Sequence, residues 1–196
     1  MRPKEGLKRE FFRRDTATVA EDLLGKELVR KVDAGLLRGR VVETEAYYGE
    51  GDPPSHAANG RTPRSEIMWG RPGLVYVYLV YGIHMMFNVV TEPENSPGAV
   101  LFRAVEPLEG FELAAETRGV EKKGELANGP GKLTEAFRIG KEENGLDLTE
   151  SEELGLVDRS DRDNLEVVTS TRIGISEGKE KELRFYLKGN QFVSSG

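Results

Sequence analysis

The residue types best suited to chemistry are concentrated between positions 47 and 84. This stretch holds five of the six tyrosines, both histidines and the only tryptophan of the chain. Two carboxylates, Glu43 and Glu45, lie just before it. A carboxylate among apolar and aromatic neighbours is suited to act as a general base, because desolvation raises its pKa. The composition of this stretch therefore predicts a site in which aromatic rings lie near a carboxylate base.

The tyrosines of residues 75–79 alternate with aliphatic side chains. Side chains of a β-strand point alternately to its two faces, so Tyr76 and Tyr78 share one face and the aliphatic residues share the other. An ordinary two-sided strand has the same pattern, so the alternation alone does not indicate a site. We expect a strand that packs one face on the core and offers phenol rings on the other.

The strand before this stretch carries the carboxylates. Glu43, Glu45 and Tyr47 lie on one face of it if the strand is regular. Glu45 is the stronger candidate base because it is next to the long loop that follows, although two solvent-facing glutamates would have the same spacing. Arg103 is a single cation in the apolar run 100–105. It either pairs with a buried carboxylate such as Glu43 or Glu45, or lies at a sheet edge.

Several kinds of chemistry are excluded by residues that the sequence lacks. It has no cysteine, which removes disulfides, thiolate zinc sites and cysteine nucleophiles. Metal-ligand spacings such as H-x-H or H-E-x-x-H, phosphate-binding glycine loops and serine-nucleophile elbows are absent as well. No lysine lies between residues 32 and 121, so the aromatic stretch supplies no amine for a Schiff base. We expect neither a metal nor a cofactor.

The formal net charge of −6 over 196 residues limits the partners. An acidic protein binds a polyanion through a local basic patch, although a solvated arginine-rich face would look the same. Candidates for such a patch are Arg9, Arg13, Arg14, Arg61, Arg64 and Arg71. The N-terminus has no apolar signal region, and the longest apolar run, residues 74–81, is too short to span a bilayer. We therefore expect a cytoplasmic protein.

Hydrophobic periodicity and turn residues predict a single domain over residues 1–196 with an α+β fold, in which a few short helices accompany a mainly antiparallel sheet. The expected strands are residues 27–32, 36–47, 75–80, 86–90, 100–105, 165–175 and 183–187. The expected helices are residues 15–24, 112–118 and 130–139, the first with a capping box of Thr18 and Glu21. Residues 48–73 form a long irregular loop of the kind that is usually functional or disordered, and residues 141–164 are acidic and turn-rich.

Motifs spread over nearly the whole chain closely resemble, in order, those of the alkyladenine (3-methyladenine) DNA glycosylases of the vertebrate and Bacillus type. They are Val42-Glu43-Thr44-Glu45-Ala46-Tyr47, His56, Arg61-Thr62-Pro63-Arg64, Leu74-Val75-Tyr76-Val77-Tyr78, Tyr81-Gly82, Asn88, Leu101-Phe102-Arg103-Ala104-Val105-Glu106-Pro107, Asn128-Gly129-Pro130-Gly131-Lys132-Leu133, Arg172-Ile173-Gly174-Ile175 and Leu183-Arg184-Phe185-Tyr186. No single fragment is specific enough alone, and their common order carries the resemblance.

The resemblance implies an enzyme that flips a damaged purine out of duplex DNA, which costs a few kcal/mol in lost stacking and pairing. Tyr81 matches the residue at the tip of a protruding β-hairpin that fills the vacated space from the minor groove. Tyr47, His56 and Tyr78 match the residues that sandwich the flipped base, and His56 also offers a hydrogen bond to its edge. Asn88 matches the residue that excludes normal guanine by clashing with its exocyclic amine.

The resemblance also implies the catalytic groups, since Glu45 and Arg103 match the pair that holds and activates water. It implies a monofunctional glycosylase that hydrolyses the N-glycosidic bond of alkylated or deaminated purines (3-methyladenine, 7-methylguanine, hypoxanthine, ethenoadenine) and so initiates base excision repair. Lyase activity is not expected, because the aromatic stretch has no lysine. The expected partner is double-stranded DNA containing damaged purines, bound by a monomer that has no membrane association.

One departure from the family pattern lies on the hairpin, and two other classes of protein stay open. His84 stands where the vertebrate members carry an aromatic residue, and with Arg61, Arg64 and Arg71 it is a candidate contact to the DNA backbone. A non-catalytic nucleic-acid-binding module would keep the hairpin tyrosine and the arginines but would not need Glu45. A hydrolase of free nucleosides would use the same carboxylate and rings but would have no use for the hairpin tyrosine.

Overall fold

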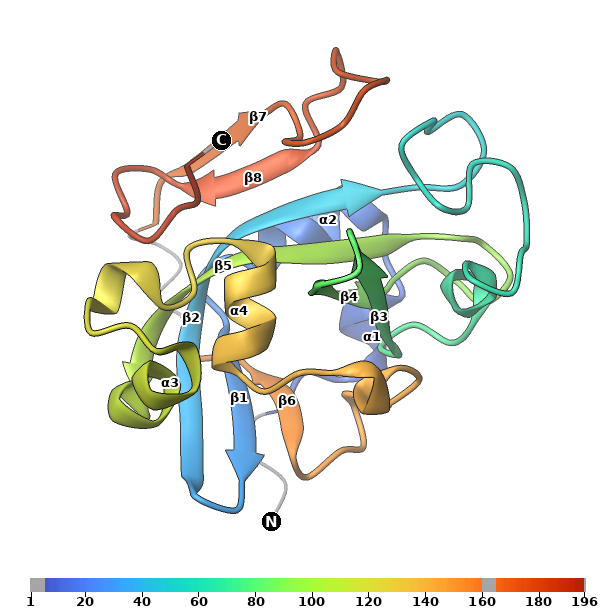
Figure 1. The fold of residues 1–196 in the computed structure, drawn as a ribbon. Helices are drawn as coiled ribbons and strands as arrows, with labels where there is room; N and C mark the ends of the chain where they lie inside the picture. The colour runs from blue at the N-terminus through green and yellow to red at the C-terminus, as the bar shows by residue number, and fades with distance from the viewer. Residues whose placement is uncertain (1–5, 160–164, 196) are drawn as a thin grey trace.

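A curled antiparallel sheet of eight strands runs through the molecule, with short helices packed around it (Figure 1). This computed structural model describes residues 6–159 and 165–195. The strands are β1 (Glu27–Val32), β2 (Gly35–Tyr47), β3 (Val75–Val80), β4 (His84–Val90), β5 (Ala99–Glu109), β6 (Leu154–Val157), β7 (Val167–Ser170) and β8 (Arg184–Leu187). They follow the order β3-β4-β5-β2-β1-β6, and β8 pairs with both β2 and β7. The predicted α+β class with a mainly antiparallel sheet is confirmed.

The long strand β2 organises the sheet because it pairs on both edges. One edge pairs with β5 along most of its length, while the other pairs first with β1 at residues 35–40 and then with β8 at residues 43–45. Register shifts against β5 near Arg38 and Glu43 bend the strand. The second half of β2 is therefore enclosed between β5 and β8, and this is the part that carries Glu43 and Glu45.

The helices lie on both faces of the sheet. They are α1 (Arg9–Phe12), α2 (Thr16–Asp22), α3 (Phe111–Arg118) and α4 (Pro130–Ala136), with 3-10 turns η1 (Glu66–Trp69), η2 (Lys123–Glu125) and η3 (Lys141–Glu143). In Figure 1, α4 lies in front of the sheet against β4 and β5, and α2 lies behind it against β2 and β5. The expected capping box at α2 is wrong. Asp15 is the cap, accepting a hydrogen bond from the Thr18 amide at 2.9 Å, because Thr18 already lies inside the helix.

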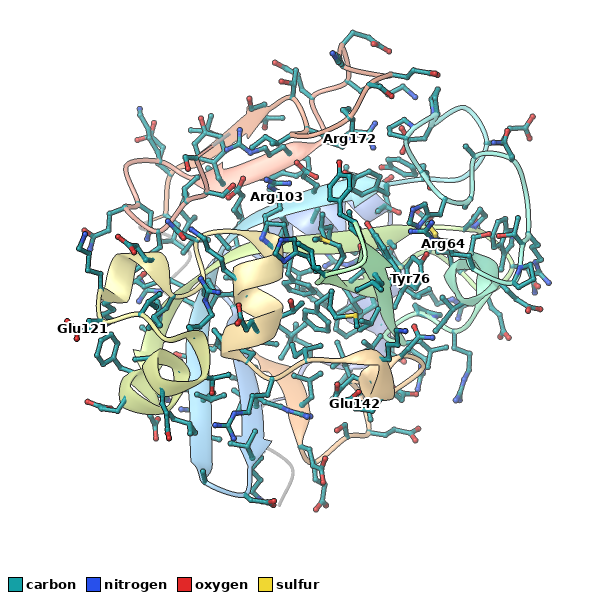
Figure 2. All side chains as sticks on the ribbon, in the orientation of Figure 1. Arg64, Tyr76, Arg103, Glu121, Glu142 and Arg172 are labelled. Atoms are coloured by element: carbon teal, nitrogen blue, oxygen red, sulfur yellow. The ribbon has the colours of Figure 1, made fainter. Side chains whose placement is uncertain are left out.

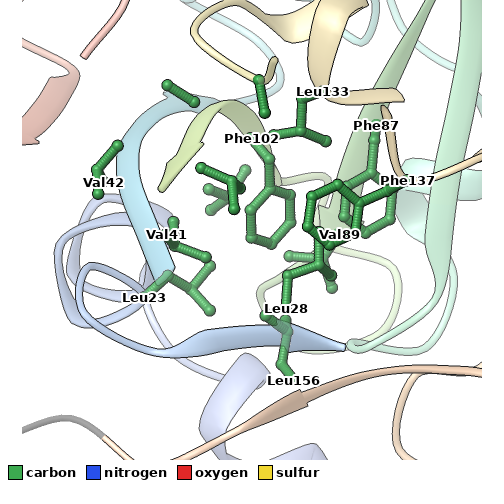
Figure 3. Close-up of a cluster of buried hydrophobic side chains, with 14 of the residues drawn as sticks. Leu23, Leu28, Val41, Val42, Phe87, Val89, Phe102, Leu133, Phe137 and Leu156 are labelled. Carbon is green, nitrogen blue, oxygen red and sulfur yellow. The ribbon is translucent and has the colours of Figure 1, made fainter. Parts of the chain in front are cut away.

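The main hydrophobic core is built by the sheet together with side chains of α2 and α4 (Figure 3). Phe87 of β4 and Phe102 of β5 stack with their ring centroids 4.7 Å apart. Leu133 and Phe137 bring the α4 segment into the same cluster. Burial of one side chain of this size contributes about 1.5–3 kcal/mol. The core therefore gives β4 and β5, which border the candidate site, a rigid support.

Gly39 lies where β2 packs so closely against its neighbours that there is no room for a side chain. A β-carbon at this position would lie 2.2 Å from Val105 Cγ1 and 3.1 Å from the Phe137 ring. Gly39→Ala is therefore expected to lower the free energy of unfolding by about 1–3 kcal/mol, measured by urea denaturation. Gly155→Ala in β6 is the matched control, because the nearest atom to its β-carbon would be 4.0 Å away. Equal stability of Gly39→Ala and wild type would contradict this packing.

The hairpin of β3 and β4 protrudes from the sheet as expected. The two strands pair along their full length, from Val75 with Val89 to Val80 with His84. β4 pairs with β5 only at residues 88–90, and the outer part of the hairpin therefore extends beyond the sheet. The long loop 48–73 lies beside it and contains a single helical turn, η1.

The C-terminal part differs most from the prediction. Of the expected strand 165–175 only β7 forms, and residues 171–175 make a loop instead. Gly174 has a φ of 74°, a left-handed conformation that a regular strand cannot contain. The four-residue elements β6 and α1 were not predicted. The predicted turn-rich segment 141–164 contains β6, and its residues 160–164 lie outside the described ranges.

Candidate active site

Strand β2 places Glu45 where its side chain has no exposed surface. Three segments supply the groups that hold its carboxylate. The Tyr47 hydroxyl donates to Oε2 at 2.8 Å, the Ile173 amide donates to Oε1 at 2.8 Å, and Nη1 of Arg103 on β5 lies 3.2 Å from Oε1. The common face predicted for Glu45 and Tyr47 is confirmed, and Arg103 pairs with a buried carboxylate rather than lying at a sheet edge.

Burial and charge act in opposite directions on Glu45. Desolvation raises its pKa, and this effect outweighs the positive charge of Arg103 and the hydrogen bonds from Ile173 and Tyr47, which lower it. A carboxylate that binds a proton more readily than usual is suited to take one from water. Burial also raises the pKa of Tyr47, so its hydroxyl stays protonated and donates to Glu45.

Glu43 is buried as well, but its hydrogen-bonding capacity is used by structural partners. Its carboxylate accepts bonds from Arg103 Nε at 3.0 Å and Arg184 Nε at 2.6 Å, and from the amide and hydroxyl of Ser194 at 2.7 and 3.0 Å. Arg103 therefore spans the two carboxylates, with Nε on Glu43 and Nη1 on Glu45. This arrangement favours Glu45 as the base and Glu43 as the group that orients Arg103.

An aromatic cluster forms where the long loop meets the phenol face of β3. His56 of the loop lies against Tyr78, with ring centroids 4.4 Å apart, and Tyr76 lies 5.1 Å from Tyr78. His56 Nδ1 shares a hydrogen bond of 2.7 Å with the Tyr76 hydroxyl. The guanidinium of Arg64 lies over the Tyr78 ring, 5.3 Å from its centroid. Arg64 and Tyr76 are labelled in Figure 2. The face that strand alternation predicted therefore contacts both a histidine and an arginine of the loop.

The protonation state of His56 is set by its surroundings. Desolvation and the nearby charge of Arg64 lower the pKa of His56 to about 4. The imidazole is therefore neutral at pH 7, with one ring nitrogen as donor and the other as acceptor. Tyr76 engages Nδ1, which leaves Nε2 to bond a ligand.

Tyr47, His56, Tyr78 and Arg103 border one cleft of about 530 Å³, a volume within the usual range of ligand sites. Its walls come from β3, β5, the hairpin tip, the long loop and the loop 171–175. The side chains with chemistry to offer that line it are Tyr47, His56, Arg64, Tyr78, Tyr81 and Arg103. Glu45 lies behind the lining, in contact with Tyr47 and Arg103.

Asn88 lies in a small recess next to the cleft, together with His56, Tyr76 and Tyr78. Its Nδ2 donates to the carbonyl of Tyr76 at 3.0 Å and to that of Met86 at 3.3 Å. Because these two bonds engage the amide nitrogen, the side-chain oxygen is the atom that remains for a ligand. Asn88 is thereby held in one orientation at the end of the site.

The tip of the hairpin holds Tyr81 out in solvent, with 89% of its surface exposed. The turn is closed by a hydrogen bond of 3.2 Å from the Ile83 amide to the Val80 carbonyl. Its central residues, Tyr81 and Gly82, have φ angles of 52° and 75°, a combination found in type I′ hairpin turns. A bulky residue with positive φ is strained, and such strain concentrates at functional sites. Ile83 is 73% exposed beside it.

The four candidates for contact with a nucleic-acid backbone occupy different surroundings. Arg64 lines the cleft, and His84 is exposed at the start of β4 next to the hairpin tip. The guanidinium carbon of Arg61 lies 5.5 Å from the ring centroid of Trp69 in its own loop. Arg71 is half-exposed, and its Nη2 lies 3.7 Å from Oδ2 of Asp147. The structure therefore brings Arg64 and His84 to the cleft and hairpin, while Arg61 and Arg71 have contacts elsewhere.

The loop 171–175 supplies part of the site that could not be predicted from residue patterns. Ile173, Gly174 and Ile175 line the cleft, and Arg172 forms a buried ion pair with Asp52 of the long loop. The signals in the sequence were an arginine in an expected strand and the motif Arg172-Ile173-Gly174-Ile175, and neither indicated a partner for the arginine. Its partner is 120 residues away in the sequence, so the pairing became visible only in the structure.

No helix within residues 6–159 and 165–195 has both the length and the apolar character needed to cross a membrane. The same residues contain no group of three or more His, Asp or Glu side chains that could hold a metal ion. The expectation that the protein works without a metal or cofactor stays a prediction.

Comparison with known proteins points to one family. The family model described as methylpurine-DNA glycosylase matches residues 10–191. A relative from Chlorobium phaeobacteroides is 46% identical over 187 residues, which is 95% of each chain. A relative from Carboxydothermus hydrogenoformans is 45% identical over 96% of this chain and 98% of its own, and one from Salinibacter ruber is 47% identical over 97% of each. All three are named "Putative 3-methyladenine DNA glycosylase". This chain belongs to the methylpurine-DNA glycosylase family, as the order of its sequence motifs indicated.

Proposed function

We propose that the protein is a monofunctional 3-methyladenine DNA glycosylase in which Glu45 is the general base and the cleft receives a purine flipped from duplex DNA. Membership of the family makes it a DNA glycosylase. One observation carries the assignment of the site. Glu45 is a buried carboxylate of raised pKa, held by Tyr47 and Arg103 directly behind a cleft that aromatic rings line.

The proposed reaction is a hydrolysis at C1′ of the damaged nucleotide. Glu45 takes a proton from water, and the water oxygen bonds to C1′ as the C1′–N bond breaks. The electron pair of the broken bond leaves with the purine. The same carboxylate stabilises the positive charge that develops on the sugar, and Arg103 orients both the carboxylate and the water. Purines that alkylation has made cationic leave as neutral bases, so 3-methyladenine and 7-methylguanine are the best substrates. Hypoxanthine and ethenoadenine are neutral, so each must also gain a proton as it leaves, and they are therefore slower substrates.

Base flipping is the proposed route by which the purine reaches the cleft. Tyr81 is exposed on a strained turn beside the cleft, which supports its insertion into the gap that the flipped nucleotide leaves. Tyr47, His56 and Tyr78 sandwich the base, and the neutral imidazole bonds its edge through Nε2. The partner is duplex DNA with a damaged purine, bound by a monomer through phosphate contacts to a basic patch that includes Arg64.

His84, Arg61 and Arg71 are further proposed contacts with the DNA backbone. His84 is exposed next to the hairpin tip, and Arg61 and Arg71 lie on the surface of the long-loop region. Each such contact releases counterions from the DNA, so binding weakens as the salt concentration rises.

Asn88→Ser is expected to relax the exclusion of undamaged guanine. The shorter side chain cannot keep the two bonds that hold Asn88 in the recess, so the clash with the exocyclic amine of guanine is lost. Release of normal guanine from unmodified duplex DNA should rise by roughly tenfold, a typical effect of one contact in a specificity pocket. Asn144→Ser is the matched control, because Asn144 bonds the Val77 amide on the edge of β3 and not in the recess. Guanine release that stays at background in Asn88→Ser would refute this role.

A single-lesion duplex tests the proposed function. Wild-type protein is incubated with duplex oligonucleotides that carry one hypoxanthine or one ethenoadenine, and each sample is split and treated with or without alkali. A monofunctional glycosylase leaves an abasic site that breaks only in alkali. Strand breaks without alkali would contradict the absence of lyase activity, and salt-sensitive binding without abasic sites from these lesions or from methylated DNA would indicate a non-catalytic binding module.

A further inference from the structure

Arg172 connects three segments that build the site. Its Nη1 donates to the carbonyl of Ala46 at 2.9 Å, at the end of β2. Its two terminal nitrogens also bond both oxygens of Asp52 in the long loop, at 2.8 and 2.6 Å. The side chains of Arg172 and Asp52 are 0% and 1% exposed. The third segment is its own loop, residues 171–175, which lines the cleft.

Arg172 lies next to both groups that donate hydrogen bonds to Glu45. The next residue, Ile173, donates its amide to Oε1 of Glu45 at 2.8 Å. The guanidinium carbon of Arg172 lies 4.7 Å from the ring centroid of Tyr47, whose hydroxyl donates to Oε2 of Glu45. Arg172 itself does not bond to Glu45 and is not among the residues lining the cleft, so any effect on the carboxylate passes through its neighbours and its charge.

Asp52 is the anchor for this arrangement. Burial favours its neutral form, but the hydrogen bonds from Arg172 and from the Tyr48 amide hold the pKa of Asp52 below its usual range. The pair is therefore ionised at neutral pH. A bidentate arginine–carboxylate contact fixes the guanidinium in direction as well as distance.

We propose that Arg172, anchored by Asp52, is a positioning residue that aims the Ile173 amide and the Tyr47 hydroxyl at Glu45 and so keeps this carboxylate ionised for catalysis. This proposal deepens the proposed function and rests on it. Without Arg172 the loop 171–175 loses its anchor, and Glu45 loses a donor that stabilises its charged form.

Several other charged or titratable groups face Glu45 and would remain when Arg172 is changed. They are Glu43 and Tyr47 on β2, Tyr78 on β3 and Arg103 on β5, and Arg184 of β8 lies opposite Glu45 in the strand pairing. Because Arg103 keeps its own anchor on Glu43, the ion pair with Glu45 is expected to persist. The contribution of Arg172 can therefore be measured separately.

The test is Arg172→Met, with two readouts. The first is the titration of the Glu45 carboxyl carbon by ¹³C NMR, assigned with Glu45→Gln. The second is the pH dependence of single-turnover excision from methylated duplex DNA. Loss of the hydrogen bond from the Ile173 amide should raise the pKa of Glu45 by about one unit. As the pH is lowered, the carboxylate of the variant is then protonated, and its excision falls, at a pH about one unit higher than in wild type. Arg172→Lys, which keeps the charge without the bidentate contact, should shift less.

The control removes a comparable ion pair away from the site. Glu143→Gln breaks the buried pair of Arg30 and Glu143, whose atoms lie 2.6 Å apart, and should lower Tm without moving either titration. If Arg172→Met lowers Tm and leaves the Glu45 titration in place, Arg172 is only structural and the proposal is overturned. If Arg172→Met does not fold, Asp52→Asn decides by the same two readouts. Wild-type excision rates in Glu45→Gln would instead refute the proposed function of Glu45 as the general base, whatever Arg172→Met does to the NMR titration.

Discussion

Glu45→Gln is expected to lower single-turnover excision of 3-methyladenine from duplex DNA by roughly 10²–10⁴-fold, the usual effect of removing a general base. Glutamine keeps the size of the side chain and can still accept hydrogen bonds from Tyr47 or Ile173. It can neither take a proton from water nor stabilise positive charge on the sugar. Because the Glu45 side chain has no exposed surface, duplex binding measured by fluorescence anisotropy should not change.

Glu106→Gln is the matched control for this prediction. Glu106 lies on the same strand as Arg103, and its carboxylate is bonded by Arg40 and Asn190 outside the cleft. The same chemical change there should leave excision near the wild-type rate. A Glu45→Gln protein that binds duplex and excises as fast as wild type would show that the base is another group.

Tyr81→Ala should reduce excision from duplex DNA by roughly 10–100-fold, which corresponds to one lost contact between a base and an aromatic ring. Tyr81 is 89% exposed, so removal of its ring should not change the free energy of unfolding. The loss should appear as a smaller population of flipped nucleotides, because the inserted ring replaces the stacking of the purine that has left. Fluorescence of 2-aminopurine placed next to the lesion measures that population.

Two comparisons separate this role of Tyr81 from a general loss of binding. The same lesion in a single strand leaves no gap in a stack, so Tyr81→Ala and wild type should excise it at similar rates. Ile83→Ala removes the other large exposed apolar side chain of the hairpin and should have a smaller effect on the duplex. An equal loss on single-stranded and duplex substrates would rule out a wedge that acts on the duplex.

Local periodicity was sufficient to predict the two strands that carry the candidate site. Residues i and i+2 of a strand share a face, so the alternation placed Glu45 with Tyr47 and Tyr76 with Tyr78, and the hydrogen bond and ring contact agree. Glycine next to Tyr81 indicated the break at the hairpin tip, where both residues have positive φ. These features depend on neighbours in the chain, and the sequence contains that information directly.

Contacts between distant segments could not be predicted in the same way. The sequence left Arg103 with two possible carboxylates, and the structure pairs it with both, because Glu43 and Glu45 share a face of β2. Ser194 bonds Glu43 from 151 residues away, and Arg172 meets Asp52 from 120 residues away. Such pairings depend on the topology of the sheet, in which β8 follows β1 along one edge of β2. Residue patterns within one sequence do not encode that order.

The most direct test of the central claim is release of free base by the wild-type protein from methylated duplex DNA and, in parallel, from the corresponding free nucleoside. Chromatography of the soluble fraction identifies the product. We expect free 3-methyladenine from the duplex, a matching number of alkali-sensitive sites and no release from the nucleoside. Release from the nucleoside alone, or duplex binding without any released base, would contradict the claim that this cleft belongs to a glycosylase acting on DNA.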